Sequence, residues 1–433
     1  MQNDFLGWRV VAGAFVLAVF GWGLGFYGPP VYLHAVQEER QWSVVLVSSA
    51  VTLHFLVGAV VVANLPALDR RFGLPRVTKA GAVLLALGVV GWAVARDPWQ
   101  LLAATLLSGA GWVAIGAAAV NAIVAPWFVA RRPAALSMAY NGASIGGVVF
   151  SPLWVAAIAF LGFPMAATVI GIGMVVTIWL LADLIFSRTP ESMGQVPDGG
   201  ASAGPATAAL STAHPLPGRL LWRDWRFLTL AAAMAFGLFA QIGLIAHLFS
   251  LLVPALGDQA AGILMGLATA SAIAGRTLVG SLMPPGSDRR LIACASHVVQ
   301  IAGSIALILA AGTDVALLIA GVLLFGFGIG NTTSLPPLIA QVEFNKADVQ
   351  RVVPLIVAIG QGTYAFAPAA FGALRALSPA EATLVFVAAA VVQALAIAAF
   401  LAGRRRTRSA LASNTSPDTG SRPTGPSPSR SSN

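Results

Sequence analysis

The sequence contains few charged side chains and a single cysteine. Charged residues make up 9% of its 433 residues, against roughly 25% in soluble domains, so the chain cannot cover a water-soluble fold of this size. Cys294 is the only cysteine, which excludes an internal disulfide and a cysteine-based metal site. No Gly-Lys-Ser or Gly-Lys-Thr follows a glycine-rich stretch, so the phosphate loop of ATP-driven proteins is absent too. We therefore expect no cofactor and no metal.

Long apolar runs dominate the chain instead. Hydrophobic residues make up 58% of it, and a run of about 20 such residues can cross a bilayer as a helix. The first run is longer than the core of a signal peptide, so we expect it to remain as a helix. The sequence predicts an all-α membrane protein with twelve transmembrane helices. The runs lie near 9–33, 43–65, 77–95, 99–126, 134–160, 164–186, 227–253, 258–282, 291–311, 314–340, 352–374 and 380–402.

The two halves of the chain resemble each other. Trp8-Arg9 opens the first run and Trp225-Arg226 opens the seventh (225 − 8 = 217), and Gly109-Ala110-Gly111 corresponds to Gly326-Phe327-Gly328 at the same offset. This repeat is far longer than the roughly 20–50 residues of solenoid repeats, so each copy is half a protein. Many secondary transporters are built from parallel halves related by an axis along the membrane normal.

These features divide the chain into four segments. We expect six-helix bundles at 1–190 and 223–403, related by pseudo-two-fold symmetry. Between them, a cytoplasmic linker at 191–222 is rich in Pro, Gly, Ala and Ser. The segment 404–433 begins with arginines and continues in Ser, Pro and Thr, a composition that cannot bury a core and predicts a disordered cytoplasmic tail.

The basic residues are unevenly distributed between the two sides of the membrane. If both termini are cytoplasmic, 21 of the 25 Lys and Arg residues fall on the cytoplasmic side, and only Arg40, Arg96 and Arg375 fall outside. The positive-inside rule selects this orientation. The net charge of +9 therefore reports topology in a lipid bilayer rather than a nucleic-acid partner. We expect a multi-pass monomer in a bacterial inner membrane.

One arginine lies inside an apolar run. Arg276 is flanked by apolar and small residues of the eighth run, where an arginine costs about 2.5–3.5 kcal/mol on insertion scales unless it faces water or a partner. Of the sixteen acids only Asp183 falls within a run, near its cytoplasmic end. A substrate anion is the natural partner, because a guanidinium matches a carboxylate with two parallel hydrogen bonds. The alternatives are that Arg276 caps backbone carbonyls or reaches the membrane surface.

Three motifs resemble those of a known family. Trp127-Phe128 followed by Arg131-Arg132 is similar to the WF-x-x-R-R-x-x-A entry to a fifth helix, and the segment from Arg188 to Gly199 to the segment after a sixth helix. Gly275-Arg276 and Gly280 fit a G-R-x-x-x-G motif of an eighth helix. The chain resembles the major facilitator superfamily, and within it the bacterial monocarboxylate porters and oxalate/formate antiporters. The resemblance implies two bundles that rock about a midplane site.

The resemblance also implies an inward gate in the loop after the second helix. The superfamily pattern there is G-x-L-x-D-R-x-G-R, which assigns gating roles to Asp69, Arg70 and Arg71. This chain has one extra residue before Gly73. In the second half the matching acid is replaced by the segment Met283-Pro284-Pro285-Gly286.

Other departures bear on the substrate. Animal-type monocarboxylate carriers have an acid four residues before the eighth-helix arginine, where this chain has Ala272, and a lysine in the first helix, which is missing here. The oxalate-type antiporter has a lysine in helix eleven, whereas no lysine lies between Arg351 and Arg375. A dianion would lack the second cationic side chain that binds its second charge, so the sequence favours a monoanion as the substrate.

Several other polar groups lie at membrane depth. His247 could bind substrate or carry a proton, or a backbone carbonyl could satisfy its ring. For the uncharged groups the competing explanation is hydrogen bonding between helices, which averages only about 0.6 kcal/mol per contact in membranes. Asn141 and Gln361 belong to related helices of the two halves, which face the cavity in this superfamily. The uncharged candidates for substrate binding are Asn121, Tyr140, Asn141, Asn331, Gln361 and Tyr364.

The sequence thus predicts a secondary transporter that moves a small organic monoanion, a monocarboxylate above all, by alternating access. Whether a proton accompanies the anion stays open, with His247 as the remaining carrier. The alternative within transport is efflux of an amphiphilic compound, with Arg276 structural. An enzyme would need a nucleophile and base or a metal cluster at one depth, and a receptor would need a soluble domain. The sequence offers neither.

Overall fold

A computed structural model describes residues 5–200, 218–284, 286–377 and 382–404. Over these residues the chain forms helices and connecting segments only. Twelve helical spans are long and apolar enough to cross a membrane, which confirms the predicted all-α architecture. The described residues up to Gly403 belong to one unit. Most of the predicted linker and all but the first residue of the predicted tail lie outside the described residues, so the predicted domain boundaries remain predictions.

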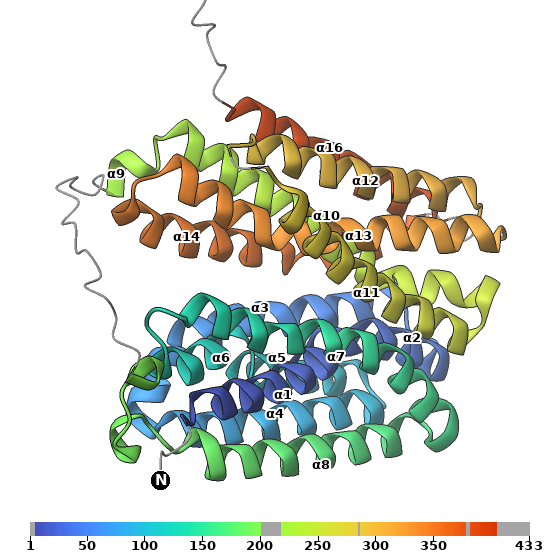
Figure 1. The fold of residues 1–433 in the computed structure, drawn as a ribbon. Coiled ribbons are helices and arrows are strands. Elements are labelled where there is room, and N and C mark those ends of the chain that lie inside the picture. The colour runs from blue at the N-terminus through green and yellow to red at the C-terminus, as the bar shows by residue number, and fades with distance from the viewer. Residues whose placement is uncertain (1–4, 201–217, 285, 378–381, 405–433) are drawn as a thin grey trace, which may run out of the picture. The chain divides into compact units, whose positions relative to one another are not determined.

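The first six spans gather into one bundle and the last six into another (Figure 1). The N-terminal half contains α1 Gly7–Gly25 with α2 Gly28–Arg40, α3 Val44–Phe72, α4 Leu74–Val94, α5 Pro98–Ala114 with α6 Ala117–Val124 and η1 Ala125–Trp127, α7 Arg132–Leu161, and α8 Phe163–Leu181 with η2 Ala182–Phe186. The C-terminal half contains α10 Trp225–Leu256, α11 Asp258–Leu282, α12 Arg289–Leu309, α13 Val315–Glu343, α14 Lys346–Tyr364 with α15 Ala367–Leu377, and α16 Thr383–Ala402. The short helices η3 Glu191–Met193, η4 Pro197–Gly200 and α9 Gly218–Leu221 lie between the halves in sequence.

Turns between successive helices are short because their residues suit the change of direction. Gly162 and Gly257 join α7 to α8 and α10 to α11 with φ of 74° and 75°, a left-handed conformation that glycine adopts without steric penalty. The side chains of Asp224 and Asp314 accept hydrogen bonds from the first turns of α10 and α13, which satisfies backbone N–H groups that have no partner within the helix.

The loop expected around Asp69 is instead helical. Helix α3 continues through Phe72, and Gly73, with φ of 85°, is the only residue between α3 and α4. The prediction of a loop was wrong because Arg70 and Arg71 extend the helix. Cations in a last turn interact favourably with the negative end of the helix dipole.

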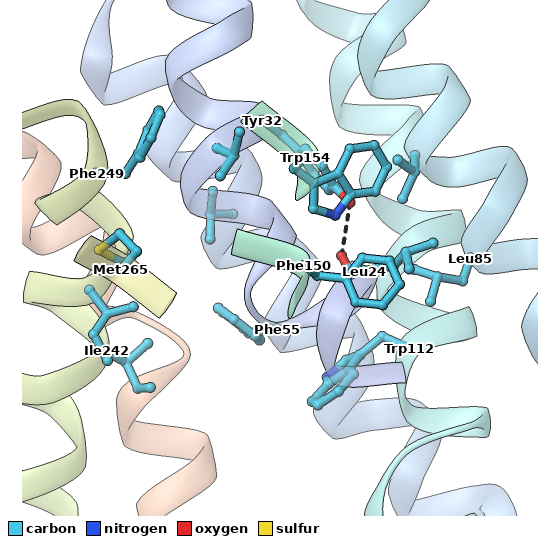
Figure 2. Close-up of a cluster of buried hydrophobic side chains, with 14 of the residues drawn as sticks. Leu24, Tyr32, Phe55, Leu85, Trp112, Phe150, Trp154, Ile242, Phe249 and Met265 are labelled. Atoms are coloured by element: carbon cyan, nitrogen blue, oxygen red, sulfur yellow. Dashed lines mark hydrogen bonds between the residues drawn. The ribbon is translucent and has the colours of Figure 1, made fainter. Parts of the chain in front are cut away.

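A break in the first span shapes the centre of the molecule. Pro29 and Pro30 have no N–H to donate, so α1 ends and α2 begins anew at Gly28. Three side chains from elsewhere donate to the carbonyls before the break: Trp154 Nε1 to Gly23 at 3.2 Å, Tyr32 Oη to Leu24 at 3.2 Å and His54 Nε2 to Gly25 at 2.9 Å. Figure 2 shows the bond from Tyr32 to Leu24 within the hydrophobic core. His54 is thereby a structural residue.

The halves meet mainly at the end remote from the N-terminus. Two polar contacts between them are a hydrogen bond of 3.0 Å from the backbone N of Ala369 to Thr52 Oγ1 and a pair in which His34 Nε2 lies 3.4 Å from Asp258 Oδ1. The apolar core is continuous there, with Phe249 and Met265 of one half beside residues of the other (Figure 2). With cytoplasmic termini, as the basic residues predict, this conformation is closed at its outer end.

Candidate functional site

A cavity of about 260 Å³ lies between the two halves. Both halves contribute to its wall, so its shape depends on how they pack against each other. The N-terminal half supplies Trp22, Phe26, Phe55, Gly58, Ala59, Val62, Trp112, Val113, Gly116, Ala117 and Ala118, and the C-terminal half supplies Met234, Leu238, Gln241, Ile242, Thr333, Val357, Gln361 and Tyr364. None of these side chains is charged.

The wall from the N-terminal half is aromatic. The rings of Trp22 and Trp112 meet edge to face with centroids 5.2 Å apart, and Phe26 lies 6.1 Å from both Trp112 and Phe55. Trp22 and Phe26 are one helical turn apart at the end of α1, so the break described above aims both at the same space. Gly58 and Gly116 leave room between the rings.

The wall from the C-terminal half is more polar. Gln241 is 3% exposed, and its Oε1 atom has no hydrogen-bond partner among the described residues. Gln361 and Tyr364 lie one turn apart on α14, and no hydrogen bond to either side chain occurs within the described part of the chain. Thr333 donates to the Gly330 carbonyl at 3.1 Å. Two amides and a phenol are therefore available to a bound molecule.

Arg276 lies beside this cavity without being one of its lining residues. It packs against Gly330, where an added Cβ would be 3.1 Å from Arg276 Nε, and Thr333, one turn further along α13, lines the cavity. Over the described residues Arg276 makes no ion pair or hydrogen bond, and its Nε is buried without a partner.

The internal repeat identifies the position of the N-terminal half that is equivalent to Arg276. The offset of 217 that relates the halves places Arg276 opposite Ala59 of α3 (276 − 217 = 59). Gly58 and Ala59 line the cavity. The equivalent position in the other half thus faces the central space.

Of the uncharged candidates, Gln361 and Tyr364 lie on the cavity wall, and two others lie just behind it. Tyr140 donates to the Ala117 carbonyl at 3.0 Å, and Asn121 is bonded to that same carbonyl and to the Tyr140 hydroxyl. The ring of Tyr140 also meets that of Trp22, 6.2 Å away.

The remaining candidates lie away from the cavity. Asn141 is exposed on α7. Asn331 is 1% exposed, and neither polar atom of its side chain has a partner among the described residues. His247 is fully buried, and its Nε2 lies 2.9 Å from the Pro368 carbonyl, where it satisfies the backbone beside the α14–α15 break.

The three residues with expected gating roles make no ion pair within the described part of the chain. Arg70 and Arg71 are exposed, Asp69 Oδ1 is buried without a partner, and the Arg71 guanidinium carbon lies 5.1 Å from the Phe72 ring. These residues are at the end where the halves are apart. A gate formed by these three residues would be open in this conformation. Their gating role remains a prediction.

The aromatic wall and Gln241 were not among the predicted site residues. A signal for the first exists in the spacing of Trp22 and Phe26, four residues apart just before Gly28-Pro29-Pro30, which aims both rings to one side of a broken helix. A signal for Gln241 is that an amide in an apolar run is itself a candidate for a cavity residue.

Comparison with known proteins identifies the fold. The profile of the Major Facilitator Superfamily matches residues 11–368. The chain belongs to the major facilitator superfamily. It is a multi-pass secondary transporter and not an enzyme.

Its relatives leave the solute open. "MFS-type transporter 1" of Ophiocordyceps sp. (strain BCC 1869) is 28% identical over 355 residues, which cover 79% of this chain and 73% of that protein. The fold is similar to that of the nucleoside transporter NupG, at a TM-score of 0.70 and 13% identity over 91% of this chain and 99% of that one. It is also similar to a D-xylose–proton symporter, at a TM-score of 0.69 and 14% identity over 92% and 97%. A bacterial homolog of the human lysosomal transporter Spinster, in an inward-facing and occupied conformation, has a TM-score of 0.68 at 13% identity over 93% and 97%.

Proposed function

We propose that this transporter carries a small organic monoanion, a monocarboxylate above all, by alternating access. The observation that supports it is Arg276, a guanidinium in a membrane-spanning helix with a buried Nε that has no partner among the described residues. Arginine at this depth is disfavoured unless it faces a cavity or pairs with an acceptor. A carboxylate would supply two parallel charged hydrogen bonds.

The site can hold such an anion between the halves. Arg276 approaches the cavity from α11, beside Thr333, and the amides of Gln241 and Gln361 line the same half. The apolar body of the anion would lie against the N-terminal half, backed by the Asn121–Tyr140 pair. Parting of the outer contacts and closure near Asp69, Arg70 and Arg71 would then expose the site to the other side. His247 has no part in this binding scheme because it lies outside the cavity.

A second candidate is a carrier of uncharged amphiphilic compounds, in import or efflux. The observation that favours it is that no charged residue among those the structure describes lines the cavity. In that case Arg276 would be a structural residue, and a dye or an uncharged aromatic compound would be transported as well as an acid.

Measuring transport by the variant Arg276→Gln distinguishes a carrier of monoanions from a carrier of uncharged compounds. In proteoliposomes, uptake of labelled monocarboxylates should fall at least tenfold, and by about 100-fold when both bonds are lost, because each hydrogen bond to a charged group contributes about 1.5–3 kcal/mol. Arg276→Lys keeps the charge without the planar fork and should retain part of the activity. Arg96→Gln, in an exposed loop, is the control.

Two outcomes would contradict the proposal. Wild-type uptake of acids by a well-folded Arg276→Gln would remove the anchor. Transport of an uncharged dye, unaffected by Arg276→Gln, together with no uptake of any acid would favour the second candidate. Monodispersity in detergent shows whether each variant folds.

A further inference from the structure

Five aromatic side chains surround the cavity, four from one half and one from the other. Trp22, Phe26, Phe55 and Trp112 come from α1, the α1–α2 break, α3 and α5, and Tyr364 comes from α14. The ring of Tyr364 meets that of Phe55 edge to face, with centroids 5.6 Å apart and planes at 86°. The aromatic wall thus continues from one half to the other.

The rings are arranged so that they do not fill the space by stacking on one another. Trp22 and Trp112 are inclined at 85°, and Phe26 and Phe55 at 58°. Trp22, Phe26 and Tyr364 are only half-buried, so part of each ring remains open to the cavity. Small residues, Gly58, Ala59, Gly116, Ala117 and Ala118, form the rest of that wall. A flat ring fits between aromatic faces and glycines, where it can stack or meet the rings edge to face.

The opposite wall contains a hydrogen-bond acceptor that is unpaired within the described part of the chain, which favours a solute with a hydrogen-bond donor. Gln241 Oε1 is a buried acceptor without a partner among the described residues, and such a group is unfavourable unless a bound molecule or water satisfies it. The Gln361 amide and the Tyr364 hydroxyl border the same space. At about 260 Å³ the cavity is below the roughly 300–1,000 Å³ of sites for drug-sized ligands, which favours a solute of one small ring.

We infer that the solute is built on a planar aromatic ring with a hydrogen-bond donor on it, of the hydroxybenzoate type. The carboxylate rests on the function proposed above, through Arg276. The aromatic ring and its hydrogen-bond donor are inferred from the residues that line the cavity. This part of the inference can therefore be tested independently of the carboxylate.

A panel of matched compounds tests the inference with the full-length protein in detergent. Binding is measured by quenching of tryptophan fluorescence and by calorimetry for benzoate, 4-hydroxybenzoate, cyclohexanecarboxylate, pyruvate and benzamide. Benzoate should bind about 2- to 10-fold more tightly than cyclohexanecarboxylate, because each aromatic contact adds to the burial of apolar area. Pyruvate should bind more weakly than either, and 4-hydroxybenzoate more tightly than benzoate.

Variants assign these differences to residues. Phe26→Leu should remove most of the preference for benzoate over cyclohexanecarboxylate, and Phe55→Leu repeats the test in case the first variant does not fold. Phe160→Leu, at a ring that is 87% exposed on α7, should keep the preference. Gln241→Leu should abolish the advantage of 4-hydroxybenzoate over benzoate, because the acceptor for the ring hydroxyl is lost.

Each result bears on one claim. Equal binding of benzoate and cyclohexanecarboxylate, or binding of pyruvate without benzoate, would overturn the aromatic inference and leave the monocarboxylate proposal intact. Benzamide bound as tightly as benzoate, with Arg276→Gln unchanged, would overturn the monocarboxylate proposal and support the ring. A preference for 4-hydroxybenzoate that survives in Gln241→Leu would overturn the assignment of the donor.

Discussion

The two halves of this transporter come from one repeated pattern, yet they present different surfaces to the cavity. The N-terminal half contributes four aromatic rings and small residues, whereas the C-terminal half contributes Gln241, Gln361, Thr333 and Tyr364. Arg276 belongs to the C-terminal half, and the equivalent region of the other half is Gly58 and Ala59. A solute held between such halves would be bound by its polar groups on one side and by its apolar body on the other.

The ends of the halves nearer the N-terminus also differ. In the C-terminal half Arg290, which is 2% exposed, makes two hydrogen bonds of 2.6 and 2.8 Å to the carboxylate of Glu343 and further bonds to the carbonyls of Arg226 and Phe400. In the N-terminal half Lys79 pairs with Asp183, whose side chain is 57% exposed, at 2.5 Å. Arg290 is buried and Glu343 is 21% exposed, whereas Lys79 and Asp183 are 18% and 57% exposed, so equal substitutions should have unequal effects.

The largest effect is expected from Glu343→Gln. Removing one member of a buried pair leaves an uncompensated charge, and the loss of stability is typically 3–5 kcal/mol. We expect about 3 kcal/mol here because Arg290 keeps its bonds to backbone carbonyls. Asp183→Asn should change stability by less than about 1 kcal/mol, as exposed pairs do. Thermal unfolding in detergent compares the two, and equal shifts would contradict the distinction between the halves.

The architecture was accessible from sequence, and so was Arg276 as a candidate anchor, whereas the cavity wall was not. The bilayer requires apolar runs, glycine pairs and basic residues at particular places along the chain. Twelve spans could therefore be predicted from local sequence without tertiary information. Arg276 could be recognised in the sequence because a charged side chain within an apolar run is unfavourable unless it faces water or a partner. Phe55 and Trp112 look like any other membrane aromatic, and only the packing of α3 against α5 brings their rings together. For His247 the sequence left a binding role and a structural role open, because the carbonyl that contacts its ring, that of Pro368, is 121 residues away in sequence.

A smaller effect is expected where the halves touch. At Gly147 an added Cβ would lie 2.6 Å from Tyr27 Cζ and 2.7 Å from Thr269 Cγ2 on the other half. Gly147→Val should disfavour the conformation described here, since overpacking costs about 1–3 kcal/mol and each 1.4 kcal/mol changes a ratio of conformers tenfold. Gly173→Val, where an added Cβ meets nothing within 4 Å, is the control.

Spin labels on engineered cysteines at the two ends of the bundles measure this shift. The native Cys294 is buried, so the engineered sites should react first. In Gly147→Val the distance between labels at the end remote from the N-terminus should gain a longer component, and transport should fall as the equilibrium is displaced. A distance distribution like that of Gly173→Val would show that the contact does not hold the halves together.

The smallest effect concerns Asp198 of η4, which accepts hydrogen bonds from the backbone N–H groups of Val129, Ala130 and Arg131 of the N-terminal half at 3.0, 2.7 and 3.2 Å. Burial raises the pKa of this carboxyl, but the three N–H groups and the Arg131 charge together outweigh it and hold the pKa below its ordinary value near 3.8. A lowered pKa means that the contact contributes stability above the ordinary value and loses it as the pH falls through the lowered one.

Hydrogen exchange at residues 129–131 should therefore be slow at pH 7 and at pH 5, and protection should be lost only below about pH 4. Asp198→Asn is the matched variant because asparagine also tolerates the left-handed backbone, φ 59°, at this position. Exchange there should accelerate about tenfold or more at pH 7, as one or more hydrogen bonds to a charged acceptor are lost, while transport stays within about twofold because the cavity is untouched. Unchanged exchange in Asp198→Asn would mean that the carboxylate does not hold this loop, and a large loss of transport would mean that the segment after η2 takes part in the movement of the halves.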